Sequence, residues 1–343
     1  MIGAALREKT YAPPMNSPIR RGLVAAATLS LIATALPASS AVAKSSYKEP
    51  PLTAPKARLA ESLVCPTAIK RGGPQPTMLV TGTGYTGEEA YAIGKAALAT
   101  TGRPICYVNF PYRTTGDIQV AAEYLVSGIR RMAASYGKPI NIFGVSQGGL
   151  LPRWVLTYWP SLRAKVTDVI AVAGTQHGTT VGLGRCSALN PCQAASWQQA
   201  AGSNMLNALN AEPDESPNPT SWTTVRTATD ETVQPTTGKN PTSSLKGATN
   251  ILIQDVCPGR QVSHIGSALD SVTFAASEDA MTHKGPANVK RLPKNVCSKL
   301  LAPGLEKMRS AGVTPTLPLF YTDLAPKLPK EPNVWAYALK RVP

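Results

Sequence analysis

Residues 139–158 read PINIFGVSQGGLLPRWVLTY, and this segment decides the fold class of the chain. Its first part is a short, mostly apolar run typical of a β-strand, and its last part has the pattern of a helix. Between them, Gly144 to Gly148 has the form G-x-S-x-G, whose glycines allow a sharp turn that raises a serine hydroxyl above a sheet. With a strand before it and a helix after it, the motif predicts a nucleophilic Ser146. The alternative is a serine in an ordinary glycine-rich turn.

Strand and helix patterns alternate on both sides of this segment. Apolar runs indicate further strands at 77–80, 105–110, 166–173 and 251–256, and we expect another strand at 223–227. Residues 117–136 have the apolar period of an amphipathic helix. This alternation predicts an α/β fold with a mostly parallel central sheet and helices on both faces.

Residues 175–220 have a looser pattern. They contain several glycines, two close cysteines, a helical stretch at 197–209 and a proline-rich turn. We interpret this segment as a cap or rim over the site rather than as part of the sheet.

The first 43 residues have the pattern of a cleavable export signal. Arginines at 20–21 precede an apolar run at 23–36, and residues 41–43 supply the small side chains of a cleavage site. The alternative is a membrane anchor, because the apolar segment is long enough to span a bilayer, but Pro37 favours cleavage. We therefore expect a secreted protein whose residues 44–343 form a single catalytic domain.

Composition narrows the choice of partners. The 343 residues carry a formal net charge of +15, an excess that favours anionic polymers or lipid surfaces but also serves solubility. No basic run interleaved with aromatic side chains indicates nucleic-acid binding. Residues 44–64 are polar and proline-rich, which predicts a surface arm. The sequence leaves the oligomeric state open.

The six cysteines all follow the expected cleavage site. An even number of cysteines in a chain that meets an oxidising environment predicts disulfides, although the sequence alone leaves their connectivity open. Cys186 and Cys192 are near enough in sequence to close a small local loop. No Cys or His spacing resembles a zinc site, so we expect no metal and no cofactor.

A serine hydroxyl is a poor nucleophile until a neighbouring imidazole takes its proton and a carboxylate orients that imidazole. His264 is the predicted base because it follows the last predicted strand. His177 is the rival, but it follows the strand next to the motif, where a loop histidine more often bonds locally. His283 lies among polar residues and is expected to be solvated.

Asp230 is the predicted acid because it follows the strand at 223–227. Asp255 is the runner-up, and Asp168 is less favoured because it lies near the start of its strand. The chain order Ser146, Asp230, His264 is the order expected of an α/β-hydrolase.

The loop TGTGYTG at 81–87 follows the first predicted strand. It lacks the Lys-Ser/Thr ending of a phosphate-binding P-loop, and its position upstream of the serine motif favours an oxyanion loop. We predict that the backbone N–H of Gln147 and the N–H and hydroxyl of Thr83 hold the oxyanion. The alternative for Thr83 is a simple turn residue.

At these residues the chain resembles the Candida antarctica lipase B-like lipases of the α/β-hydrolase superfamily. The resemblance covers roughly residues 60–300 and lies in 82–84, 123–124, 146–150, positions between 154 and 166, 197–199, 228–235, Cys257, His264, Gly266 and Ser267.

The resemblance implies a catalytic triad and the disulfides. The triad is Ser146, Asp230 and His264, with the oxyanion hole at Thr83 and Gln147. The implied disulfides are Cys65 with Cys106 and Cys257 with Cys297, which leaves Cys186 with Cys192.

The chain departs from the family pattern in places that bear on substrate preference. Val145 replaces a tryptophan beside the nucleophile, which changes the pocket next to the alcohol part of an ester. The segment after Cys297 is shorter and lacks the last disulfide.

These features together predict a secreted serine carboxylic-ester hydrolase, a triacylglycerol lipase that meets ester or acylglycerol substrates at a lipid–water interface. Alternatives with the same triad are a short-chain esterase, a polyester hydrolase or an acyltransferase. An alternative of another class is a non-catalytic secreted protein that binds lipid or the cell surface on a degenerate hydrolase fold.

Overall fold

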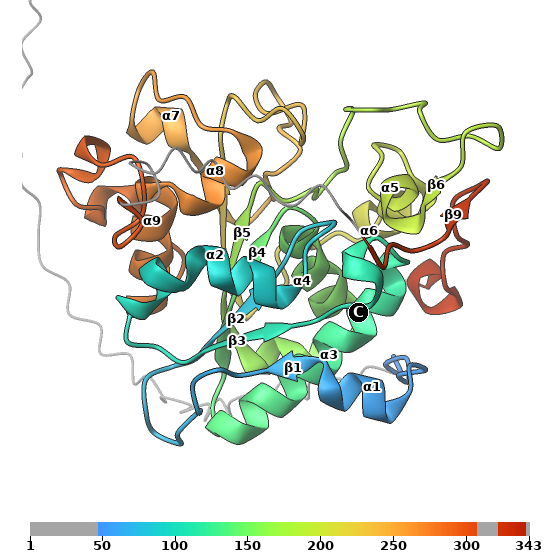
Figure 1. Ribbon diagram of the computed structural model, residues 1–343, viewed down its shortest axis with the longest axis horizontal. Coiled ribbons are helices and arrows are strands. Elements are labelled where there is room, and N and C mark those ends of the chain that lie inside the picture. The colour runs from blue at the N-terminus through green and yellow to red at the C-terminus, as the bar shows by residue number, and fades with distance from the viewer. Residues whose placement is uncertain (1–46, 307–321, 341–343) are drawn as a thin grey trace, which may run out of the picture. The chain divides into compact units, whose positions relative to one another are not determined.

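A seven-stranded sheet organises the residues that this computed structural model describes, which are 47–306 and 322–340 (Figure 1). Its order is β1-β3-β2-β4-β5-β7-β8, and neighbouring strands are parallel except for β1 and β3. The strands are β1 (Leu63–Val64), β2 (Thr77–Val80), β3 (Ile105–Val108), β4 (Ile140–Val145), β5 (Val166–Val172), β7 (Ser221–Arg226) and β8 (Thr249–Leu252). The predicted α/β class is confirmed. The expected export signal at 1–43 lies outside the described residues.

Helices follow most of the parallel strands, as crossover connections require. They are α1 (Lys56–Glu61), α2 (Gly87–Ala99), α3 (Ile118–Tyr136), α4 (Gln147–Tyr158), α5 (Ala194–Gln198), α6 (Asn204–Asn210), α7 (Ile253–Val256), α8 (His264–Leu269) and α9 (Ser271–Thr282). A separate antiparallel pair joins β6 (Cys192–Gln193) to β9 (Lys327–Leu328). No helix among the residues described has the length and apolar character needed to cross a membrane.

Alternation along the strands divides the core between the two faces of the sheet. Met78 and Ile142 belong to a cluster with α3 and α4, whereas Leu79 and Phe143 belong to one with residues of α2. Further along the sheet, Ile170 packs with residues of α9 on the side away from α3 and α4. The sheet is therefore covered on both faces, which explains its near-continuous apolar strands.

Two local predictions were wrong at their boundaries. The apolar run at 251–256 is a strand only to Leu252, and α7 takes the rest. The single helix expected at 197–209 is two helices, because Gly202 adopts a positive φ and Ser203 caps the start of α6. The described part of the surface arm expected at 44–64 does lie at the surface, with only Leu59 and Ser62 buried, and it is anchored because it forms α1 and β1 and its backbone bonds to a buried glutamate.

Candidate active site

The serine motif forms a strained turn between β4 and α4. Ser146 has φ 58° and ψ −123°, a conformation that side-chain-bearing residues rarely adopt. A Cβ on Gly144 would lie 1.9 Å from the carbonyl oxygen of Gly148, and a Cβ on Gly148 would lie 2.0 Å from that of Val80. Because both contacts are with backbone, only glycine fits at either position. The turn has the geometry of a nucleophile elbow.

Asp230 and His264 are hydrogen-bonded to each other. Nδ1 of His264 lies 2.8 Å from Oδ2 of Asp230, and the side chains are 5% and 2% exposed. The other carboxylate oxygen of Asp230 accepts from the backbone N–H groups of Thr232 and Val233, each at 2.8 Å. Since a carboxylate only accepts, the Nδ1–H of the imidazole donates to it. This bond leaves Nε2 as the nitrogen available to a nucleophile.

The backbone of His264 is hydrogen-bonded as well as its ring. His264 begins α8, and its N–H donates to Oε2 of Glu231 at 2.9 Å. The side chain of Ser263 caps the same helix by accepting from the N–H of Gly266. Glu231 was not singled out from the sequence, although it follows the predicted acid directly. Adjacent acidic residues thus fix the ring and the main chain of one histidine.

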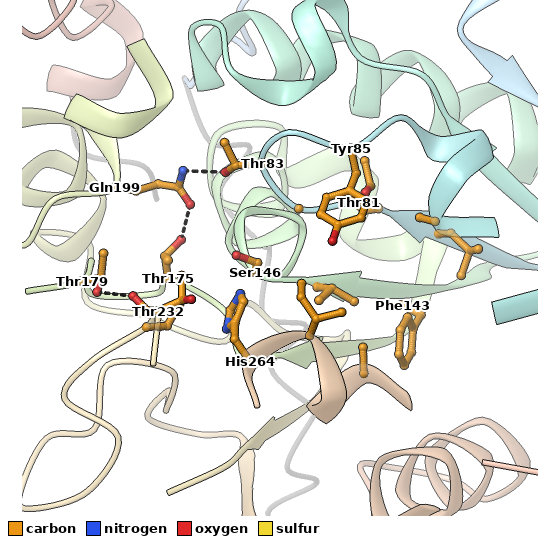
Figure 2. A pocket seen from close by; sticks show the side chains of 18 of the residues that line it. Thr81, Thr83, Tyr85, Phe143, Ser146, Thr175, Thr179, Gln199, Thr232 and His264 are labelled. Carbon is orange, nitrogen blue, oxygen red and sulfur yellow. Dashed lines mark hydrogen bonds between the residues drawn. The ribbon is translucent and has the colours of Figure 1, made fainter. Parts of the chain in front are cut away.

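Ser146 and His264 line one cavity of about 830 Å³. Figure 2 shows the imidazole of His264 directed toward the side chain of Ser146. Ser146 itself is only 8% exposed. The structure therefore brings the predicted nucleophile Ser146 and the predicted base His264 to the same cavity.

The competing candidates lie in other surroundings. Nδ1 of His177 is 3.1 Å from the carbonyl oxygen of Thr242, and its Nε2 is 3.5 Å from Glu215. That hydrogen bond from His177 lowers the pKa of Glu215 to about 2. His283 is half exposed and contacts Asp279.

The alternative acids also differ from Asp230 in position. Asp255 is exposed on α7. Asp168 is buried near the start of β5, at the end of the strand remote from Ser146.

A polar network surrounds the predicted oxyanion hole. Gln147 is the first residue of α4, where the backbone N–H has no acceptor within the helix. The hydroxyl of Thr83 donates to Oε1 of Gln147 at 2.7 Å. It accepts from Nε2 of Gln199 at 2.9 Å (Figure 2). Oε1 of Gln199 in turn accepts from Thr175 at 3.0 Å. The hydroxyl of Thr83 therefore has to rotate before it can donate to a substrate, while its N–H keeps its place.

A second strained turn is hydrogen-bonded to the predicted oxyanion loop. Tyr112, Arg113 and Thr114 have φ values of 52°, 51° and 60°. Nε of Arg113 donates to the carbonyl oxygen of Gly84 at 3.0 Å, and the carbonyl oxygen of Arg113 accepts from the N–H of Gly84 at 2.8 Å. Oγ1 of Thr114 lies 2.6 Å from the carbonyl oxygen of Gly82. This turn therefore bonds to the residue on each side of Thr83.

Three disulfides brace the described residues. They join Cys65 to Cys106, Cys186 to Cys192 and Cys257 to Cys297, the pairs that the resemblance implies. The bridge from Cys186 to Cys192 lies in the segment interpreted as a cap, and both cysteines line the cavity. Among the residues that the structure describes, no group of three or more His, Cys, Asp or Glu side chains is arranged to hold a metal ion.

Two known lipases are similar to this chain, one in sequence and one in structure. The chain is 34% identical to Lipase B of Pseudozyma antarctica over 242 residues, which are 69% of this chain and 70% of that protein. Its structure matches the crystal structure of Aspergillus fumigatus lipase B with a TM-score of 0.75 and 25% identity, over 84% of this chain and 73% of that one.

A more distant match shows the fold alone. The Bacillus licheniformis lipase BlEst2 in its propeptide form matches with a TM-score of 0.50 and 14% identity, over 66% of this chain and 54% of that chain. No family model matches the sequence. The organism of the first relative, Pseudozyma antarctica, was formerly named Candida antarctica. On the similarity to these two lipases, the chain belongs to the lipase B family of the α/β-hydrolases and is a carboxylic-ester hydrolase of the lipase and esterase class.

Proposed function

We propose that this protein is a secreted serine lipase that hydrolyses acylglycerols through an acyl-enzyme. The observation that carries the proposal is the buried bond between His264 and Asp230, in a cavity that also contains Ser146 on its strained turn. Family membership supports the ester-hydrolase chemistry.

In the proposed first step, Oγ of Ser146 attacks the ester carbonyl carbon while Nε2 of His264 takes the hydroxyl proton. Asp230 orients the ring and stabilises the imidazolium. The negative charge that develops on the carbonyl oxygen is held by the N–H groups of Thr83 and Gln147. Collapse of the tetrahedral intermediate breaks the bond to the alcohol, which leaves with the proton from His264.

In the second step, water attacks the acyl-enzyme and His264 takes a proton from it. The second tetrahedral intermediate then releases the carboxylic acid, and Ser146 recovers its proton from the imidazolium. Every proton removed by the histidine is returned within the cycle, so no external reactant besides water is required.

Replacement of Ser146 tests the chemistry. We expect Ser146→Ala and His264→Ala to lower kcat on p-nitrophenyl butyrate by at least about 10⁴-fold, because members of a triad act as one unit. His283→Ala is the matched control, since His283 is half exposed and bonds locally. Turnover by Ser146→Ala at the wild-type rate would exclude the proposed nucleophile.

Lipase and esterase activity are separated by the physical state of the substrate. We expect hydrolysis of emulsified triolein as well as soluble p-nitrophenyl butyrate. Activity confined to the soluble ester would assign a short-chain esterase, and transfer of the butyryl group to added butanol at a rate above hydrolysis would assign an acyltransferase.

Secretion is part of the proposal because the three disulfides suit an oxidising compartment. The expected export signal at 1–43 predicts that the protein recovered from the culture medium begins at Lys44. Sequencing its N-terminus decides this, and a cell-associated chain that retains residues 1–43 would contradict it.

A further inference from the structure

The cavity at Ser146 extends in two directions. One part lies against the cap segment, where Val181, Leu183 and Trp197 line it. The other part, here called the inner limb, runs along the sheet between α2 and the α8–α9 region, where Phe143, Ala268 and Phe274 line it. An ester also has two arms on either side of its carbonyl carbon, so a two-part cavity around the nucleophile can hold one arm in each part.

The floor of the inner limb is unusual for a central strand. Ile140 and Ile142 of β4 are fully buried against the opposite face, whereas Phe143 and Val145, which alternate with them, are only partly buried. Both partly buried side chains line the cavity. Since β4 has strand neighbours on both sides, this exposure faces the cavity rather than an open sheet edge.

One side of α2 forms a wall of the inner limb. Ala90, Ile93, Gly94, Ala97 and Leu98 follow the spacing of a single helix face, and all of them line the cavity. This is the face that would ordinarily pack onto a core. Its small members, two alanines and a glycine, leave open the space that larger side chains would fill.

The inner limb ends at charged and polar groups. Arg103 and Glu278 form an ion pair, and together with Thr77 at the start of β2 they line the end remote from Ser146. Thr77 pairs with Asn141, five residues before Ser146 on β4. Five residues of strand span about 16 Å. A hydrocarbon chain advances about 1.25 Å per carbon, given bonds of about 1.5 Å, so the limb matches a chain of about a dozen carbons.

We propose that the inner limb binds one long, unbranched hydrocarbon arm of the ester and that the Arg103–Glu278 pair is its end stop. The proposal rests on the proposed function, because the arm is delivered to Ser146. The arm can belong to the acyl or the alcohol part of the ester. Both share the chemistry of an extended alkyl chain. Such a chain gains free energy by leaving water for an apolar wall, and it loses free energy where it would displace water from the partly buried ion pair.

Gly94 offers a position at which the limb can be filled. A Cβ there would lie 3.3 Å from the end of the Leu98 side chain, which can move, and both phenylalanine and leucine favour a helix more than glycine does. Gly94→Phe therefore places a ring in the limb, and Gly94→Leu is a smaller plug in case the ring is not accommodated. Ala92→Phe is the matched control, because Ala92 is an exposed residue of the same helix.

Two ester series distinguish the source of the arm. One is p-nitrophenyl butyrate, octanoate, decanoate and myristate, and the other is ethyl, octyl, decyl and tetradecyl acetate. We expect kcat/KM in one series to rise by up to about four-fold per methylene toward a dozen carbons and then to fall. Gly94→Phe or Gly94→Leu should lower the decanoate-to-butyrate or decyl-to-ethyl ratio at least ten-fold, while Ala92→Phe keeps it. The affected series identifies the arm.

Failure of this proposal differs from failure of the proposed function. If turnover depends on Ser146 but both Gly94 variants keep the wild-type chain-length profile, the inner limb binds no substrate arm. A binding measurement needs no turnover. In calorimetry, 1-decanol should bind the Ser146→Ala variant, and it should bind the double variant that carries both Ser146→Ala and Gly94→Phe at least ten-fold more weakly. Equal affinity of 1-decanol for the two variants would overturn the proposed role of the inner limb, even if the protein hydrolysed no ester.

Discussion

Asp168 is a buried acid that the proposed reaction does not use, and replacing it with asparagine should remove a pH-dependent loss of stability. The carboxyl group is 2% exposed on β5. Its Oδ1 has no hydrogen-bond partner among the described residues, and neither polar side-chain atom of Asn141, its neighbour in register on β4, has one either. Burial without a compensating charge raises the pKa of Asp168 from 3.8 to about 7.

The size and sign of the effect follow from proton linkage. Between about pH 4 and pH 7 the folded protein keeps the proton of Asp168, whereas the unfolded chain has released it. Unfolding therefore releases a proton in this window, and the free energy of unfolding falls as pH rises. A gap of about three pKa units corresponds to about 4 kcal/mol. This contribution is fully present below about pH 4 and is lost by about pH 7.

Urea denaturation of the disulfide-bonded protein at pH 4, 5.5, 7 and 8 measures this loss. Asparagine keeps the shape of the side chain but cannot ionise. The free energy of unfolding of Asp168→Asn, taken relative to that of wild type, should therefore be about 4 kcal/mol higher at pH 8 than at pH 4. Asp255→Asn, which removes an exposed carboxyl, controls for the change of charge. A constant difference between Asp168→Asn and wild type across this range would refute the reasoning.

Three further predictions concern the supports of the site. Thr114→Val should lower kcat about ten-fold with KM nearly unchanged, because the bond it removes holds the predicted oxyanion loop rather than the substrate. Thr114→Ser keeps the hydroxyl and should have a kcat near that of wild type, so equal losses of kcat in both variants would contradict this role. Gln199→Ala removes a hydrogen bond to Thr83 and should lower kcat, measured at saturating ester, by a similar factor. An unchanged kcat would show that the network does not position Thr83. Replacing Cys257 and Cys297 with serine should lower the free energy of unfolding by about 4 kcal/mol, since the bridge spans 40 residues, and a loss below about 1 kcal/mol would argue against a chain-entropy origin.

The sequence predicts most of the sheet because its signals there are local. The strands β2, β4 and β5 are short, mostly apolar runs. The serine motif needs glycine at two positions because a side chain there would collide with backbone, and the G-x-S-x-G spacing encodes that need. The boundary at 251–256 was missed because a short apolar run does not distinguish a strand from a helix. The break at Gly202 and Ser203 did carry a signal, a glycine followed by a helix-capping serine, within a stretch read as one helix.

The supports of the site are harder to predict because they depend on contacts between distant residues. The bond from Gln199 to Thr83 joins positions 116 residues apart, and no spacing rule relates them. The positive φ values of Tyr112, Arg113 and Thr114 are equally hidden, since none of these residue types favours that conformation. The cap interpretation of residues 175–220 stays a prediction, although part of that segment lines the cavity.

The central claim is that Asp230 and His264 make Ser146 a nucleophile, and covalent labelling tests it most directly. Wild-type protein treated with diethyl p-nitrophenyl phosphate should release one p-nitrophenolate per chain and carry the diethyl phosphoryl group on the peptide that contains Ser146. His264→Ala should be labelled at least about 10³-fold more slowly, whereas His177→Ala should be labelled at a rate near that of wild type. Labelling at another residue, or at an undiminished rate in His264→Ala, would contradict the proposed site.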